Sequence, residues 1–131
     1  MAELMIVDDD PGIRFIVKKI LTKEGYDVSE AESGENALEK LKVERPNLIL
    51  LDIMMPGIDG WETCRKIKDD DELKSIPVVI LTVRSSDSDK SKSFQESGAD
   101  AHLTKPIIWE KLLSTVKWVL KNVPKEAEVK G

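Results

Sequence analysis

The sequence predicts an α/β fold in which helices cover both faces of a parallel β-sheet. Short apolar runs alternate along the chain with amphipathic stretches of helical periodicity, a pattern typical of repeated βα units. The strongest run, Asn47 to Leu51, carries apolar side chains for both faces, as a central parallel strand must. We therefore expect five βα units that form a five-stranded parallel sheet between two helical layers.

Five strands are expected where the apolar runs are short and are followed by polar or turn-forming residues. The second of these runs is weak, and the third is the most apolar. The expected strands are Leu4–Val7, Asp27–Ala31, Asn47–Leu51, Pro77–Leu81 and Ala101–Leu103.

One helix is expected after each of these strands, where apolar residues recur every three or four positions. Gly25 ends the first helix, and Ser33 can cap the second. We expect one domain over residues 1–123 and a flexible tail over 124–131, which shows no packing pattern. The expected helices contain Ile13, Ile16, Val17, Ile20 and Leu21; Ala37, Leu38 and Leu41; Trp61, Cys64 and Ile67; the polar stretch Asp87–Ser97; and the stripe Ile108, Trp109, Leu112, Leu113, Val116, Val119, Leu120 and Val123.

Two aromatic residues fall outside the apolar stripes of their helices. On a helical wheel, Trp118 lies opposite the arc that contains Trp109, and Phe15 lies off the stripe of the first helix. We expect Trp118 to be partly exposed on a partner-binding face, and Phe15 to be either exposed on a second such face or half-covered by its neighbours.

Composition narrows the functional class. The net charge is −5 and the pI is about 5.0, without a basic stripe, which argues against direct nucleic-acid binding. No apolar run is long enough to cross a membrane, and the N-terminus does not read as a signal peptide. Cys64 is the only cysteine, so no internal disulfide can form, and we expect a small buried thiol and a cytoplasmic location.

Polar residues follow four of the five expected strands. Asp8 and Asp9 come after the first strand, Asp52 after the third, Thr82 after the fourth, and Lys105 shortly after the fifth. Because the carboxyl ends of parallel strands meet at one edge of a sheet, these side chains should converge there. Taken singly, each residue could start a turn, cap a helix or lie in solvent, but their joint position favours a functional site.

Three carboxylates packed together repel one another unless a cation compensates them. Oxygen ligands suit Mg²⁺, which can also bridge to a phosphate. Lys105 and Thr82 could then bind phosphoryl oxygens, and Asp52 at the end of the central strand is placed to attack phosphorus. Asp10, which precedes Pro11, is interpreted as a helix cap.

These residues lie in segments that resemble the receiver domains of two-component signalling, such as the chemotaxis regulator. The resemblance covers residues 3 to about 123 and implies a flavodoxin-like (βα)5 three-layer sandwich. The segments are Ile6-Val7-Asp8-Asp9-Asp10, Leu50-Leu51-Asp52-Ile53-Met54-Met55-Pro56, Asp59-Gly60, Ile80-Leu81-Thr82 and Leu103-Thr104-Lys105-Pro106.

The resemblance implies that Asp52 accepts a phosphoryl group from a sensor histidine kinase or a histidine phosphotransfer protein. Asp8, Asp9, Asp52 and the backbone carbonyl of Met54 would hold Mg²⁺, and Thr82 and Lys105 would bind the phosphoryl oxygens. Such a protein is a phosphoacceptor switch that catalyses only its own phosphorylation and dephosphorylation, and is not a conventional enzyme.

The resemblance also implies a switch and a set of partners. Thr82 would move toward the phosphoryl group, and His102, which stands where the family commonly has Tyr or Phe, would follow it. The output face, formed by the fourth helix, the fifth strand and the last helix with Trp118, would bind an effector protein or an effector domain. Phe15 belongs to the first helix, which would dock histidine phosphodonors. A phosphorylation-dependent homodimer stays open, whereas contact with nucleic acid or a membrane is not expected.

Three alternative functions compete with the receiver interpretation. A metal-dependent aspartyl-phosphate hydrolase needs a second Asp two residues after the nucleophile, and Met54 occupies that position. A flavin mononucleotide electron carrier needs a phosphate-binding loop after the first strand, where Asp8-Asp9-Asp10-Pro11 stands instead. The last is a receiver used only as an interaction module, which the complete set of acceptor, metal and phosphate residues disfavours.

Overall fold

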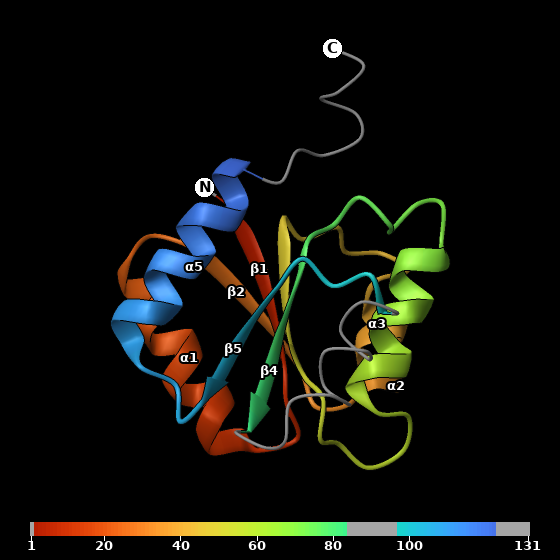
Figure 1. Ribbon diagram of the computed structural model, residues 1–131, viewed down its shortest axis with the longest axis horizontal. Coiled ribbons are helices and arrows are strands. Elements are labelled where there is room, and N and C mark those ends of the chain that lie inside the picture. The colour runs from red at the N-terminus through yellow and green to blue at the C-terminus, as the bar shows by residue number, and fades with distance from the viewer. Residues whose placement is uncertain (1, 84–96, 123–131) are drawn as a thin grey trace.

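The computed structural model describes residues 2–83 and 97–122, and these form one parallel sheet between two helical layers (Figure 1). The strand order is β2-β1-β3-β4-β5, so β3 is central. This confirms the predicted flavodoxin-like α/β sandwich. The strands are β1 (Glu3–Val7), β2 (Asp27–Ala31), β3 (Leu48–Asp52), β4 (Val78–Val83) and β5 (Ala101–Lys105).

Among the residues that the structure describes, two helices cover each face of the sheet (Figure 1). Helices α1 (Pro11–Lys23) and α5 (Trp109–Asn122) pack on one face, and α2 (Gly34–Lys40) and α3 (Gly60–Asp69) on the other. The expected helix over Asp87–Ser97 lies outside the described residues except for its last residue, and so does the expected tail over 124–131. The domain boundaries therefore stay a prediction.

The alternation of side chains along β3 explains the two-sided core. Leu48 and Leu50 pack under α1 and α5, whereas Ile49 and Leu51 pack under α2 and α3, and all four are fully buried. Burial of apolar surface at about 25 cal/mol per Å² makes this strand a principal source of stability. It also fixes where β3 ends, at Asp52, which pairs with Leu81 of β4.

The helices begin where the sequence supplies a capping side chain. Asp10 accepts hydrogen bonds from the amides of Gly12 (2.8 Å) and Ile13 (3.4 Å), ahead of α1. Ser33 and Asp59 cap α2 and α3 in the same way. Because these caps satisfy amides that have no partner within the helix, they set the point at which each loop leaves the carboxyl edge of the sheet.

Three apolar stripe positions were predicted wrongly, and one of them, Ile108, precedes the first residue of α5 and is 55% exposed. Trp109 was expected on the buried arc of the last helix, yet it is 55% exposed. It is the first residue of α5, and the buried part of that helix begins only at Leu112, where the helix lies over the sheet. Ile16 is also exposed, because the buried stripe of α1 is centred on Val17 and Leu21.

The expected exposure of Trp118 is confirmed, since 58% of this residue is exposed on α5. Phe15 on α1 is 65% exposed, so of its two predicted environments the exposed one is correct. The Lys19 ammonium lies 5.8 Å from the centre of the Phe15 ring, within cation–π range. Exposed aromatic side chains are frequent interface anchors.

Cys64 is buried, as expected for a lone cysteine. Its thiol donates to the carbonyl of Ser97 over 3.4 Å, and burial raises the pKa of the thiol to about 11. A thiol with that pKa is a packing group rather than a nucleophile at neutral pH. Within residues 2–83 and 97–122, none of the helices has the length and apolar character needed to cross a bilayer.

Candidate functional site

The carboxyl edge of the sheet brings together the acidic residues predicted from the strand ends. Asp8 and Asp9 follow β1, and Asp52 is the last residue of β3. One carboxylate oxygen of each lies within 4.8 Å of the others. Asp8 is fully buried and Asp52 is only 2% exposed, whereas Asp9 is open to solvent. The predicted convergence of these three acids is therefore confirmed.

Lys105, the last residue of β5, lies between the two buried acids. Its ammonium nitrogen is 3.0 Å from Asp8 Oδ2 and 3.3 Å from Asp52 Oδ1. The Lys105 ammonium thus contacts acids that follow or end β1 and β3, although neither strand is a neighbour of β5. It reaches both because the three strands end at the same edge of the sheet. Charge-assisted contacts of this kind hold the side chains in fixed positions.

The charges at this edge are not balanced by the lysine. Burial, and next the charge of Asp8, raise the pKa of Asp52 above its ordinary value of 3.8, although Lys105 and the amide of Met54 act in the opposite direction. Burial lowers the pKa of Lys105, but its hydrogen bond to Asp8 and the charges of Asp8 and Asp52 outweigh this, so that the pKa is raised. Three acids facing one lysine leave a negative site that favours a further cation.

Backbone groups also hold the two buried carboxylates. The amide of Asp10 donates to Asp8 Oδ1 over 2.9 Å, and the amide of Met54 donates to Asp52 Oδ1 over 3.3 Å. The Met54 side chain itself is exposed beside the acceptor. The role expected for the Met54 carbonyl as a metal ligand stays a prediction.

Gly60 lets helix α3 begin directly against the end of β3. A side-chain carbon at this position would collide with the carbonyl oxygen of Asp52 and the Cα atom of Ile53. The amide of Gly60 donates to the carbonyl of Ile53 over 3.2 Å. This hydrogen bond joins the first residue of α3 to the first residue of the loop after Asp52.

Thr82 and His102 lie on the same face of the sheet. Thr82 is 2% exposed and follows Leu81, the register partner of Asp52. His102 is exposed and pairs with Ile80, two residues before Thr82. Because paired residues of parallel strands project to one face, both side chains lie on the side covered by α2 and α3. The role of Thr82 and His102 as a switch pair stays a prediction.

Arg14 is a site residue that the sequence did not reveal. Its Nη1 donates to the backbone carbonyl of Asp8 over 2.7 Å, and its Nε donates to Glu30 Oε1 over 3.1 Å. The available signal was a charged residue at helical spacing from Val17 and Leu21, on the buried side of α1. Such a position needs a partner, but the sequence did not indicate which one.

Comparison with known proteins decides the family. A model described as the response regulator receiver domain matches residues 4–117. The chain belongs to this family. It is a receiver domain of two-component signalling, a class of phosphoacceptor switches, and the predicted family and function are thereby confirmed. The match favours this function over the hydrolase and the flavin carrier.

Relatives of this receiver domain differ in total length. Protein PilH of Pseudomonas aeruginosa is 38% identical over 120 residues, which are 92% of this chain and 98% of PilH. Transcriptional regulatory protein AfsQ1 of Streptomyces coelicolor is 40% identical over 127 residues, which are 97% of this chain but 55% of AfsQ1. The chain therefore spans about half the length of AfsQ1 and nearly all of PilH.

Solved structures agree with the assignment. The signal receiver domain of a signal transduction histidine kinase from Syntrophus aciditrophicus superposes with a TM-score of 0.88 at 37% identity, covering 94% of this chain and 92% of the other. Chemotaxis protein CheY4 of Vibrio cholerae gives a TM-score of 0.86 at 34% identity, covering 91% and 98%. Receiver folds of this kind thus occur in proteins of different architecture.

Proposed function

We propose that Asp52 of this receiver domain accepts a phosphoryl group from a phosphohistidine of a sensor histidine kinase or histidine phosphotransfer protein, with Mg²⁺ at the site. The position of Asp52 carries the proposal. Its carboxylate is almost fully buried at the end of the central strand, 3.3 Å from the Lys105 ammonium and within 4.8 Å of two further acids. A buried carboxylate is poorly solvated, and this favours its attack on phosphorus.

The donor set fits Mg²⁺. Asp8, Asp9 and Asp52 offer only oxygen atoms, which a hard divalent cation prefers, and the exposure of Asp9 leaves one side open for water ligands. These carboxylates and the Met54 carbonyl would hold the ion. When bound, Mg²⁺ neutralises charge on the transferring phosphoryl oxygens and between the acids.

The chain's own residues then perform the transfer. An oxygen of Asp52 attacks phosphorus, an O–P bond forms, and the N–P bond to the donor imidazole breaks with its electron pair passing to the ring nitrogen. Lys105 is placed to donate to one phosphoryl oxygen, and the hydroxyl of Thr82, one residue past the register partner of Asp52, to another. Positioning and charge compensation are the main requirements of such a transfer.

Mass measurement of the intact protein after incubation with acetyl phosphate and Mg²⁺ tests this function. The wild type should gain the mass of one phosphoryl group and Asp52→Ala should gain none, because the attacking oxygen is lost. Asp71→Ala is a matched control, since its side chain is 95% exposed and remote from the site. An adduct on Asp52→Ala would displace Asp52 from its role. A wild type without an adduct would support a receiver used only as an interaction module.

The output side of the proposal rests on Thr82 and His102. Bonding of the Thr82 hydroxyl to the phosphoryl group would draw it toward Asp52, and His102 on the same face would follow and alter the surface of β5. Trp118 on α5 would then anchor a reader of that surface, while Phe15 on α1 would contact the phosphodonor. The reader is a separate effector protein or an effector domain in a longer polypeptide, since relatives of both lengths exist.

His102→Ala should be phosphorylated to the wild-type extent but should lose the phosphorylation-dependent change in hydrogen exchange along β5 and α5. The acceptor and its cation are untouched, whereas the moving side chain is removed. Thr104→Ala, also exposed on β5, is the matched control and should respond as the wild type does. A full exchange response in His102→Ala would show that His102 does not switch.

A further inference from the structure

We propose that Arg14 is a positioning residue for the Mg²⁺ site, where its guanidinium fixes the peptide between Asp8 and Asp9 and so directs the Asp9 carboxylate. This inference rests on the proposed Mg²⁺-dependent function. It is independent of whether Asp52 or any other group attacks phosphorus.

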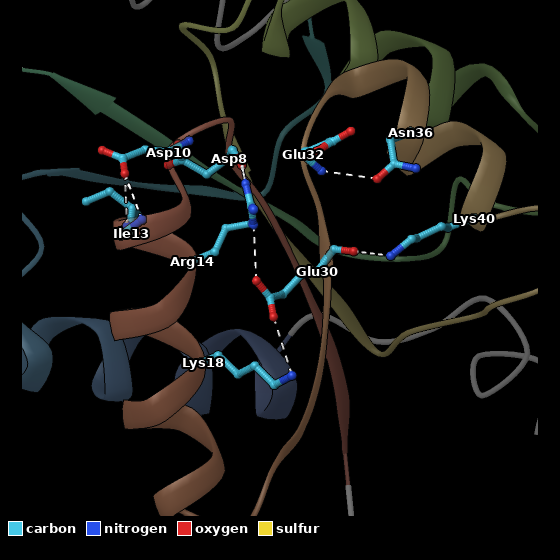
Figure 2. A network of polar contacts seen from close by, with 10 residues as sticks. Asp8, Asp10, Ile13, Arg14, Lys18, Glu30, Glu32, Asn36 and Lys40 are labelled. Atoms are coloured by element: carbon cyan, nitrogen blue, oxygen red, sulfur yellow. Dashed lines mark hydrogen bonds and ion pairs between the residues drawn. The ribbon is translucent and has the colours of Figure 1, made fainter.

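Arg14 joins three elements at the edge of the site. The residue lies on α1, its Nη1 donates to the Asp8 carbonyl just after β1, and its Nε donates to Glu30 of β2 (Figure 2). Only 16% of the side chain is exposed. A charge-assisted hydrogen bond of 2.7 Å in a mostly buried position is strong and geometrically restrictive.

The carbonyl that Arg14 binds lies where the strand ladder stops. The amide of Asp8 still pairs with the carbonyl of Ala31 over 3.1 Å, whereas β1 itself ends at Val7. A carbonyl beyond the ladder needs another donor when water has little access, and Arg14 supplies it. Because this carbonyl belongs to the Asp8–Asp9 peptide, its orientation sets the direction in which the Asp9 side chain leaves the backbone.

Asp9 depends on this restraint more than the other two acids. The Asp8 carboxylate is held by the amide of Asp10 and by Lys105, and the Asp52 carboxylate by the amide of Met54 and by Lys105. Within the part of the chain that the structure describes, no hydrogen bond or ion pair holds the Asp9 carboxylate. Its position relative to the other ligands therefore depends on the backbone that Arg14 fixes.

Glu30 explains why an arginine suits this position. The Nε contact fixes the plane of the guanidinium, so that Nη1 of the same group points at the Asp8 carbonyl (Figure 2). The backbone of Glu30 is in turn held by the ammonium of Lys40, which donates to its carbonyl. A lysine at position 14 would have one nitrogen for both partners, whereas the planar fork of an arginine reaches both at once.

Calorimetric titration with Mg²⁺ alone tests the inference. Arg14→Met should weaken Mg²⁺ binding about 10-fold, which is typical for loss of a group that orients a metal ligand. Lys18→Met is the matched control, because Lys18 pairs with the same Glu30 over 3.4 Å but does not contact Asp8. Its 45% exposed side chain should matter little, and we expect less than about a twofold change. Arg14→Lys should fall between the wild type and Arg14→Met.

Phosphorylation by acetyl phosphate across a range of Mg²⁺ concentrations separates positioning from a purely structural role. Arg14→Met should need more Mg²⁺ but should reach the wild-type extent at saturation. Equal Mg²⁺ affinity in Arg14→Met and the wild type, or a phosphorylation defect that Mg²⁺ does not relieve, would overturn the inference. A wild type that binds no Mg²⁺ would instead overturn the proposed metal-dependent function.

Discussion

Asp52→Asn should unfold at a higher urea concentration than the wild type in Mg²⁺-free buffer at pH 7, although it loses the acceptor. Asp52 is buried beside Asp8, and Lys105 compensates only part of their combined charge. Replacement by a neutral amide of similar shape removes that repulsion and the cost of burying the charge. We expect a gain of about 1 kcal/mol in the free energy of unfolding, a common size when a strained functional residue is replaced.

The gain in stability of Asp52→Asn over the wild type should depend on pH, and the pKa of Asp52 determines in which direction. Burial, followed by the charge of Asp8, raises the pKa of Asp52 in the folded state above its ordinary value of 3.8. The folded state therefore binds the proton more tightly, and this contribution to stability is complete below pH 3.8 and lost as the pH rises through the raised pKa. The advantage of Asp52→Asn should be present at pH 7 and shrink toward acid. Urea titrations at several pH values that show no advantage at pH 7 would contradict the charge argument.

Mg²⁺ provides the control for this prediction. If the acids hold the ion, the wild type gains stability from binding, and Asp52→Asn, which lacks one ligand, gains less. When Mg²⁺ is added, the urea midpoints of the wild type and Asp52→Asn should therefore approach each other or change order. An unchanged difference would indicate that the stabilisation of Asp52→Asn does not come from the metal site.

Lys105→Met should lower the free energy of unfolding by about 2 kcal/mol in Mg²⁺-free buffer, because removing one partner of a buried ion pair leaves uncompensated charge. The Lys105 ammonium contacts both Asp8 and Asp52, so its loss leaves two buried carboxylates facing each other. We choose a value below the usual range because 19% of the lysine side chain is exposed. Chemical denaturation followed by circular dichroism measures the change.

A double variant isolates the charge effect from lost packing. In an Asp52→Asn background, Lys105→Met should cost less, because only one buried acid remains opposite position 105. Added Mg²⁺ should restore more stability to the single variant Lys105→Met than to the wild type, as a cation replaces the missing one. Equal costs in both backgrounds would assign the effect to packing of the lysine chain instead.

Much of the site could be predicted from the sequence, because the ends of the apolar strands can be located in it. A parallel sheet then places the residues at those ends along one edge. Asp8, Asp52 and Lys105 are separated widely in the chain, yet each follows an apolar run, and the carboxyl ends of β1, β3 and β5 share one edge. The family resemblance indicated the same residues and also implied their roles, which their spacing does not reveal. The exposure of Trp118 followed from helical periodicity alone.

What could not be predicted depends on tertiary position. Periodicity places Trp109 on the apolar arc, but it does not show that α5 begins there, ahead of the sheet that would cover it. Arg14 was missed because its partners, Glu30 and the carbonyl of Asp8, come from two other elements. A contact between a side chain and a distant backbone group leaves no periodic pattern in a sequence.

The close approach of Gly60 to the acceptor strand has an evolutionary consequence. The first residue of α3 touches the backbone of Asp52 and Ile53, so even one methyl group there would separate the helix from the strand. The close packing of α3 against the end of β3 therefore depends on the absence of a side chain at position 60, not on a favourable side-chain contact. Divergence of this protein from its relatives should thus spare position 60, whereas the exposed Met54 side chain beside the same site meets no such steric restriction.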